Sequence, residues 1–297
     1  MLRALAVSFA MLAVTLGPCA AQTKPPAVDI CNAARTGAGN QQPTHSNSAA
    51  GSSDEDYAAE NELLEAANQS RELAGVPRLR MEESLREAAR AHARRMVESE
   101  RLEHRLPGEP SLLERIAQVS PLRVDRAGEN IAYASCAPGA NDVLMRSAPH
   151  RENLLDRGFN IAGVAAIWSK GRLYVVQDFA HEVPSYSAQQ SGELVGRAVG
   201  EMRQQAGLPE LVQLNPPNLD EAACSLAREN RPNAHLLAAA YDNRKIIAYT
   251  ESRPEVLPPG AMRLLRDSGV RQFAVGSCYA RNAAYPTGMY WVAILLY

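Results

Sequence analysis

The chain of 297 residues contains one pattern twice, in the same order. Four short segments of the first half recur in the second: LAGVPRL at 73–79 as QAGLPEL at 205–211, EAA at 87–89 as EAA at 221–223, IAY at 131–133 as IAY at 247–249, and DRG at 156–158 as DSG at 267–269. A repeat this long indicates a duplicated domain rather than a solenoid of short repeats. We therefore expect two similar units, in which the fold of one constrains the fold of the other.

Helical patterns come first in the leading unit. Apolar residues recur at helical spacing over 54–74, which predicts a first helix. A second helix is expected from Ser84, where Ser84 and Glu87 form a capping box that satisfies free backbone amides of the first turn. A third helical stretch covers 142–155 and is expected to break at Pro149.

A hairpin pattern follows the helices. Segments 160–168 and 173–179 are rich in Val, Ile and aromatic residues, and Ser-Lys-Gly-Arg at 169–172 joins them. This arrangement predicts two antiparallel strands with a tight turn. Helices followed by a hairpin indicate an α+β domain with an antiparallel sheet.

The N-terminus has the pattern of a secretory signal. Arg3 precedes an apolar run from Ala4 to Leu16, and small residues follow at 19–21. We expect residues 1–21 to be a signal peptide and the mature protein to be exported, either periplasmic or extracellular. Residues 22–56 are rich in Pro, Gly, Ser and Asn, which predicts a disordered linker.

Composition excludes several function classes. The formal net charge is −2, and no basic face interleaved with aromatic residues is visible, so nucleic-acid binding is not expected. After the signal segment, which is too short to span a bilayer as a permanent helix, no apolar stretch is long enough to cross one, so an integral membrane protein is not expected. The 46% hydrophobic content is ordinary for a globular protein.

Two histidines and one acid stand out from this ordinary background. His104 follows the second helix, Glu129 lies in Gly-Glu-Asn at 128–130, and His150 lies in Ser-Ala-Pro-His at 147–150. If the fold brings them together, they can hold a metal ion or polarise a ligand. The second unit has Arg-Lys-Ile at 244–246 in place of Gly-Glu-Asn, and it lacks the Ser-Ala-Pro-His stretch. Because the core pattern persists without these polar residues, we interpret them as serving a ligand rather than the fold.

These motifs resemble the CAP superfamily. His104, GENIA at 128–132, MRSAPHRENLL at 145–155 and VVQDF at 175–179 occur in the family's order within residues 60–181. The family includes cysteine-rich secretory proteins, insect antigen 5, plant pathogenesis-related proteins of class 1 and exported bacterial proteins, and the bacterial branch is the most similar. The resemblance implies a three-layer α-β-α sandwich over 57–183, and we interpret 190–297 as a degenerate second copy in tandem.

The resemblance also implies a cavity lined by two histidines and two acids, in which some members bind zinc or another divalent ion. His104 and His150 match the histidines and are the implied metal ligands, and Glu129 matches the first acid. The second acid falls at Ser147, which we retain as a cavity residue. Because a hydroxyl is a poor metal ligand beside imidazole and carboxylate, any metal is expected to be weakly held.

Four cysteines remain after removal of the signal segment, which permits two disulfides in the oxidising compartment that export implies. Cys224 lies on the second unit's principal helix and Cys278 on its first strand, and helix and sheet pack face to face in this architecture. We therefore predict a bond between Cys224 and Cys278, which leaves Cys31 for Cys136.

Several of these residues also have structural interpretations. His92 lies on an apolar helix face and is expected to be a hydrogen-bonded core histidine. Glu129 could equally cap a helix or accept backbone amides, and Asn153 is expected to support the local backbone. Ser147 and His150 suggest a serine hydrolase, but no nucleophile elbow or oxyanion loop surrounds Ser147.

The sequence therefore predicts an exported CAP-domain protein whose function is binding rather than turnover. The ligand would be a small molecule, a lipid or a cell-envelope component at the His104, Glu129 and His150 cavity, with or without a divalent metal such as zinc. One alternative is a metal-dependent hydrolase of the envelope, either a peptidase or an esterase. Another is a structural envelope protein with a vestigial cavity. The second copy would act as a scaffold or recruit an envelope partner.

Overall fold

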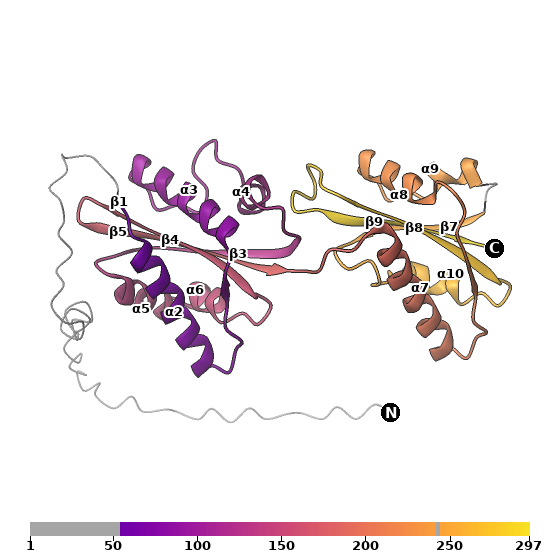
Figure 1. The fold of residues 1–297 in the computed structure, drawn as a ribbon, viewed down its shortest axis with the longest axis horizontal. Helices are drawn as coiled ribbons and strands as arrows, with labels where there is room; N and C mark the ends of the chain where they lie inside the picture. The colour runs from indigo at the N-terminus through magenta and orange to yellow at the C-terminus, as the bar shows by residue number, and fades with distance from the viewer. Residues whose placement is uncertain (1–53, 242–243) are drawn as a thin grey trace, which may run out of the picture.

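The computed structural model describes residues 54–241 and 244–297, and these form two α+β units joined by a short connection (Figure 1). The first unit comprises residues 54–183, and α7 opens the second unit. Each unit has its own hydrophobic core, because no buried apolar cluster among the described residues combines members from both. The predicted signal peptide and residues 22–53 of the predicted linker lie outside the described residues.

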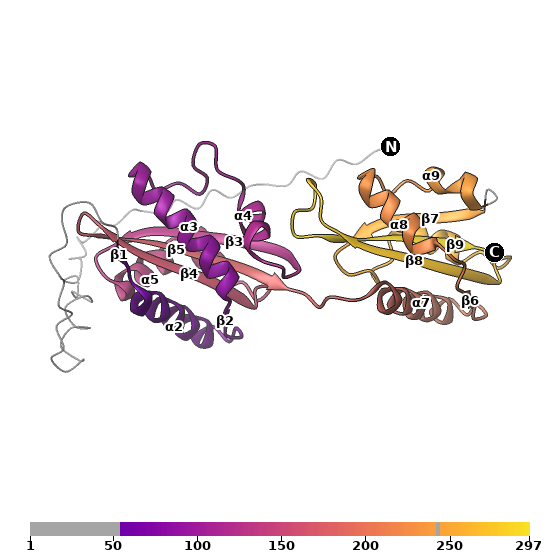
Figure 2. The same cartoon turned by 45° about the horizontal axis from the view of Figure 1, so that its top comes forward.

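The first unit has three layers, as expected for a CAP-type sandwich. Its elements in chain order are β1 (Asp54–Glu55), α2 (Tyr57–Leu73), β2 (Arg80–Met81), α3 (Glu83–Ser99), α4 (Leu112–Val119), β3 (Val124–Ala134), α5 (Ala137–Arg146), α6 (Ala148–Leu154), β4 (Ile161–Ser169) and β5 (Arg172–Glu182). The sheet runs β1-β4-β5-β3, with β2 parallel to β4. Helices α3 and α4 cover one face and α2, α5 and α6 the other (Figure 2).

The predicted hairpin forms the centre of this sheet. Strands β4 and β5 are antiparallel and read as nearly continuous apolar runs, because helices cover both faces. Lys170 and Gly171 both have positive φ, 49° and 74°, as the two central residues of a tight hairpin turn require. Strand β5 extends to Glu182, beyond the predicted end at residue 179.

The structure corrects three sequence expectations. The predicted linker ends too late, because β1 pairs with β4 and Asp56 caps α2 by accepting from the Ala59 amide. The predicted capping box of α3 is wrong: Glu82 is the N-cap without a side-chain bond, and the Ser84 hydroxyl instead contacts Glu82 and Ser120. The third helical stretch is two helices, and the break falls at Ser147 rather than Pro149.

The second unit repeats the strand arrangement of the first. Its elements are α7 (Ala188–Gln205), β6 (Val212–Leu214), α8 (Leu219–Arg228), α9 (His235–Ala238), the 3₁₀ helix η1 (Ala239–Tyr241), β7 (Lys245–Glu251), α10 (Pro259–Leu265), β8 (Gln272–Ala280) and β9 (Met289–Leu296). The order β6-β8-β9-β7, with β6 parallel to β8 and the other pairs antiparallel, matches β2-β4-β5-β3. Helix α7 begins two residues before the predicted boundary at 190.

Each unit contains the same buried arginine anchor. The Arg71 guanidinium donates to the carbonyl oxygens of Pro77, Leu154 and Asp156, which ties α2 to the turn after it and to the end of α6. In the second unit, Arg203 donates in the same manner to the carbonyl oxygens of Pro209, Leu265 and Asp267. Both side chains are almost fully buried, so their donors need these carbonyl partners.

A close approach of helix to strand also recurs. A Cβ added to Gly163 on β4 would lie 2.1 Å from the Leu85 carbonyl carbon of α3. A Cβ added to Gly276 on β8 would lie 2.2 Å from the Leu219 carbonyl oxygen of α8. Only glycine leaves room for the helix backbone at these two points.

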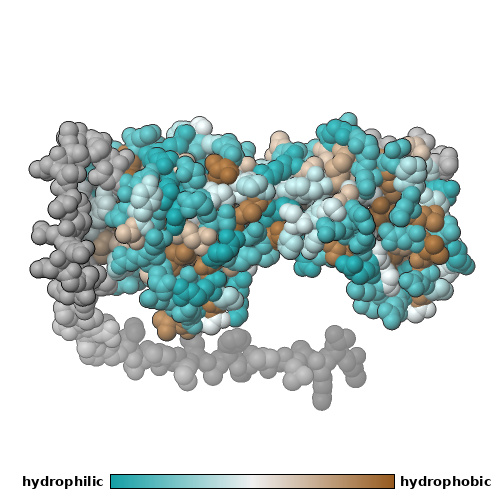
Figure 3. All heavy atoms as spheres, viewed as in Figure 1, coloured by the Kyte–Doolittle hydropathy of each residue, from teal (hydrophilic) through white to brown (hydrophobic). Residues whose placement is uncertain are grey.

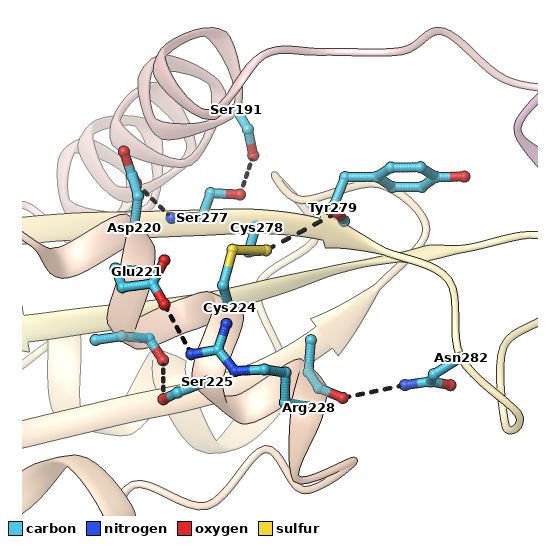
Figure 4. Close-up of a disulfide and its surroundings, with 12 residues drawn as sticks. Ser191, Asp220, Glu221, Cys224, Ser225, Arg228, Ser277, Cys278, Tyr279 and Asn282 are labelled. Atoms are coloured by element: carbon cyan, nitrogen blue, oxygen red, sulfur yellow. Dashed lines mark hydrogen bonds and ion pairs between the residues drawn. A yellow bond between two sulfur atoms is a disulfide. The ribbon is translucent and has the colours of Figure 1, made fainter.

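The predicted bond between Cys224 and Cys278 is present. It joins α8 to β8, with Cα atoms 5.0 Å apart (Figure 4). Cys136, which caps α5, is also disulfide-bonded. Its predicted partner, Cys31, lies outside the described residues, so that pairing stays a prediction.

The surface of both units is mostly hydrophilic in the view of Figure 3, with small and scattered apolar areas. Within residues 54–241 and 244–297, no helix has the length and apolar character needed to cross a bilayer.

Candidate ligand site

Glu129 lies in the middle of β3, where the sheet faces the α3 and α4 layer. It is paired across the strands with Asp178 on β5, and Asp178 is in turn paired with Gly163 on β4. The expectation that Glu129 caps a helix or accepts backbone amides is therefore wrong. Its side chain is only 5% exposed, and its oxygens contact side chains rather than backbone amides.

His104 is brought against Glu129, as the sequence predicts. The distance between His104 Nδ1 and Glu129 Oε1 is 2.8 Å. Because the carboxylate also contacts Arg115 and is a charged acceptor, we assign the Nδ1 proton to His104 as the donor. The His104 side chain is 57% exposed, so an open imidazole is fixed to a buried carboxylate.

Behind this pair lies a buried ionic cluster. Arg115 on α4 donates to Glu129 Oε2 and to the His104 carbonyl oxygen, and it lies 3.6 Å from Glu109 Oε2. His92 on α3 contacts Glu109 through Nδ1 at 2.8 Å, as expected for a satisfied core histidine. Its Nε2, however, is buried without a partner among the described residues and lies 3.8 Å from Glu129 Oε2. His92 therefore belongs to the same cluster.

Asp178 is the second acid of the cluster. Its carboxyl group is fully buried, and neither oxygen accepts a hydrogen bond from a donor group among the described residues. Burial and the adjacent Glu129 hold the pKa of Asp178 well above its usual range. The raised pKa favours a protonated Asp178 carboxyl group beside Glu129.

His150 lies beside His104 at the start of α6. The two ring centroids are 6.5 Å apart and the planes are tilted by 43°. Burial, followed by the charge of nearby His104, lowers the pKa of His150. This favours a neutral His150 ring at pH 7.

Two asparagines fix α6 against β3 and so position His150. Asn130 Nδ2 donates to the His150 carbonyl oxygen at 3.0 Å. Asn153 Nδ2 donates to the Glu129 carbonyl oxygen and to Asn130 Oδ1, both at 3.1 Å. The prediction that Asn153 supports the backbone agrees with these contacts, which tie the two motifs of the sequence to each other.

Ser147 stands apart from these residues. It ends α5 and begins α6, and its amide and carbonyl bond within that junction. Among the described residues, no hydrogen bond links its hydroxyl to His104, Glu129 or His150. Its role in the cavity stays a prediction, whereas Asp178 supplies a second acid from a different strand.

The donor set offers no ready metal site. Within the part of the chain that the structure describes, no group of three or more His, Cys, Asp or Glu side chains is arranged to hold an ion. His104 and His150 provide two imidazoles, but both oxygens of Glu129 are occupied by His104 and Arg115. Since zinc takes at least three protein ligands in most sites, these residues do not fit a tightly bound ion as they stand.

Arg115, Glu109 and Asp178 were not predicted as site residues from the sequence. A signal for α4 existed, because Ser111 and Glu114 form a capping box just before a short amphipathic helix. A signal for Asp178 also existed, because a carboxylate inside a Val-rich strand must find a buried partner. No sequence pattern predicts which partner it finds.

Comparison with a family model identifies the domain that carries this cluster. Residues 64–179, which contain the cluster just described and most of the helices and strands of the first unit, match the model of the cysteine-rich secretory protein family, CAP. These residues are a CAP domain. The α+β fold and the resemblance inferred from the sequence are thereby confirmed for this part of the chain. No curated protein matches the chain significantly.

Solved structures with similarity to the chain include a protein with an SCP domain, a cysteine-rich secretory protein and an outer surface protein. An extracellular protein containing an SCP domain from Bacillus anthracis is 24% identical over 42% of this chain and 40% of its own, with a TM-score of 0.38. An outer surface protein from Borrelia burgdorferi is 16% identical over 45% and 99%, with a TM-score of 0.42. A cysteine-rich secretory protein from Staphylococcus aureus is 21% identical over 48% and 42%, with a TM-score of 0.34. The chain thus spans less than half of the Bacillus protein, and the assignment of the CAP domain rests on the family model.

Proposed function

We propose that this is an exported CAP-domain protein that binds a small ligand, a lipid or a cell-envelope component through His104, Glu129 and His150. The observation that supports it most is the exposed His104 ring bonded to a buried, arginine-paired carboxylate. Fixing a half-open imidazole in this way orders one polar group at the surface, which lowers the entropy lost when a ligand binds. A surface hollow of about 660 Å³ includes Glu109 in its lining, but none of His104, Glu129 and His150.

Export is supported by two separate features. The Cys224–Cys278 disulfide persists in an oxidising compartment. The similar Bacillus and Borrelia proteins are described as extracellular and outer-surface proteins. The compartment, periplasmic or extracellular, is part of the proposal.

The experiment that tests binding compares small molecules that co-purify with the protein. Wild type and a His104→Ala, His150→Ala double variant would be purified from the same exporting host, extracted and compared by mass spectrometry. We expect at least one species that is retained by the wild type and lost from the double variant. A His235→Ala variant, which changes an exposed histidine of the second unit, is the matched control. Identical extracts from all three proteins would contradict the proposal.

Binding is favoured over hydrolysis because Glu129 is poorly placed as a base. Its side chain is 5% exposed, and both oxygens already contact positively polarised groups. A general base needs a free oxygen within reach of water or substrate. Turnover of peptide or ester substrates that disappears in Glu129→Gln would reverse this preference. If neither a bound species nor turnover is detected, the alternative of a vestigial cavity is the one that stands.

The weakly held zinc ion at His104 and His150 stays a separate prediction. Calorimetric titration of zinc into wild type and the double variant tests it directly. Equal zinc binding by both proteins would show that His104 and His150 are not the zinc ligands.

We also infer that the second unit is a degenerate CAP-like copy. The shared strand order, the Arg71 and Arg203 anchors, and the Gly163 and Gly276 close approaches support this. Register through the two glycines places Ala248 and Ala293 where the first unit has Glu129 and Asp178. This register replaces the sequence alignment that set Lys245 opposite Glu129.

A further inference from the structure

An arginine of the second unit donates hydrogen bonds to the C-terminal end of a helix of the first unit. Arg281 directly follows β8, in a loop that extends toward α4 in Figures 1 and 2. Its guanidinium donates to the carbonyl oxygens of Ala117 at 3.2 Å, Ser120 at 2.9 Å and Leu122 at 2.9 Å. These carbonyls lie at and just beyond the C-terminal end of α4, where helix carbonyls lack intrahelical partners. A cation at this end also interacts favourably with the helix dipole.

A second arginine belongs to the first unit and contacts residues of the second unit. Arg123, from the segment after α4, is 3% exposed and donates to the carbonyl oxygens of Pro184 and Ser252. Its guanidinium lies over the Tyr290 ring at 4.2 Å and the Tyr279 ring at 5.0 Å from the centroids. Such a stacked and hydrogen-bonded guanidinium is a strong and geometrically specific contact.

Both arginines hold the same short segment, residues 117–123. This segment connects α4, which carries Arg115, to β3, which carries Glu129. The side chains of Arg115 and Glu129 are directly ion-paired in the cluster behind His104. The second unit therefore holds the connection between the two elements whose relative position sets that ion pair.

We propose that the second unit is a positioning clamp for the ligand site, and that Arg281 and Arg123 fix the approach of Arg115 to Glu129. Arg281 bonds to backbone carbonyls rather than to a side chain of the cluster, so it is a positioning residue that acts through Arg115. The inference rests on the proposed function only in treating this cluster as the ligand site. The alanines at the matching positions of the second unit agree with a supporting role for that unit.

The proton on Asp178 gives a readout that needs no ligand. The groups that face Asp178 are Glu129 from β3, which raises its pKa, Arg115 from α4, which lowers it, and Glu109 from the loop before α4, which raises it. If Arg281→Ala lets Arg115 withdraw, the ¹³Cγ resonance of Asp178 should titrate about one pH unit higher or more. In the same variant, exchange of the buried Arg115 Nε–H with solvent should accelerate about threefold or more, because local opening becomes easier.

Three variants and one internal reference separate positioning from simple stability. Arg281→Lys keeps a cation that can donate to the same carbonyls and should restore most of both signals. Arg231→Ala removes an exposed arginine of the second unit and should change neither. In an Arg115→Met background, Arg281→Ala should no longer move the Asp178 titration. The Arg90 Nε–H, which is buried against Glu60 elsewhere in the first unit, should exchange at the wild-type rate throughout.

Wild-type values for both Asp178 and Arg115 in Arg281→Ala would overturn the clamp. A shift that persists in the Arg115→Met background would also overturn it, because the effect would not pass through Arg115. If the alanine variant fails to fold, Arg281→Lys and Arg281→Gln are compared instead, and equal signals from these two would contradict the proposal. Failure of the ligand-binding test leaves these outcomes unchanged.

Discussion

At the residue scale, the first unit concentrates buried charge at one point. Glu109, Glu129 and Asp178 share this region with Arg115, and all four are at most 8% exposed. Three carboxylates beside one guanidinium cannot all ionise cheaply at low dielectric. The raised pKa of Asp178 is the way this cluster lowers its charge.

Replacing Asp178 with asparagine should therefore stabilise the protein in a pH-dependent way. The folded state keeps the Asp178 proton above about pH 4, where an aspartate in the unfolded chain ionises. Wild-type stability thus falls as pH rises toward the pKa of folded Asp178, whereas an amide holds the same shape without that cost. Urea denaturation of wild type and Asp178→Asn should show a larger advantage for the variant at pH 8 than at pH 4. An advantage that does not depend on pH would contradict the assigned proton.

Removing Arg115 should have the opposite effect. Arg115→Met leaves Glu129 and Glu109 without their buried cation, and breaking a buried pair of this kind costs about 3–5 kcal/mol. The free energy of unfolding from urea titration at pH 7 measures this loss. Arg101→Met, at an exposed pair with Glu103, should cost less than about 1 kcal/mol. Equal losses in the two variants would show that the cluster is not tightly coupled.

At the scale of elements, α6 depends on β3 for its position. Asn153→Ala removes the donor that both the Glu129 carbonyl and Asn130 Oδ1 accept from, so we expect a loss of about 1–3 kcal/mol. The His150 ring resonances should also shift, because α6 carries that ring. Glu152→Ala, on the exposed neighbouring position, is the control for both measurements. Unchanged His150 resonances in Asn153→Ala would mean that α6 is held by other contacts.

The sequence predicted some elements well for local physical reasons. The β4–β5 hairpin carries its turn in Lys170 and Gly171, and its strands are mostly apolar. Strand β3 was missed because its first half is mostly polar: Asp125 and Arg126 are exposed, and Glu129 faces the buried cluster. Helix α4 was missed because only eight residues form it. His104, Glu129 and His150 were found through motif order, whereas Arg115 and Asp178 join them through contacts that no local pattern encodes.

At the scale of the whole molecule, the second unit relies on a covalent link. The Cys224–Cys278 bond closes a loop with a sequence separation of 54 residues, and a loop of this length corresponds to about 4 kcal/mol in the chain-entropy estimate. A Cys224→Ala, Cys278→Ala variant should unfold its second unit at a lower urea concentration. In a Trp168→Phe background, fluorescence of buried Trp291 reports on this unit. Cys136→Ala, in the first unit, is the control, and an unchanged Trp291 midpoint in the double variant would contradict the expected contribution.

The two glycines that admit a helix backbone have a practical consequence. At Gly163 or Gly276, a single methyl group would act as a wedge between a strand and the helix that rests on it. Gly163→Ala should loosen only the half that holds Trp168, and Gly276→Ala only the half that holds Trp291. Each half of the molecule thus has its own destabilising substitution and its own tryptophan. Tryptophan fluorescence during urea unfolding of the two variants can therefore show whether one half unfolds while the other stays folded.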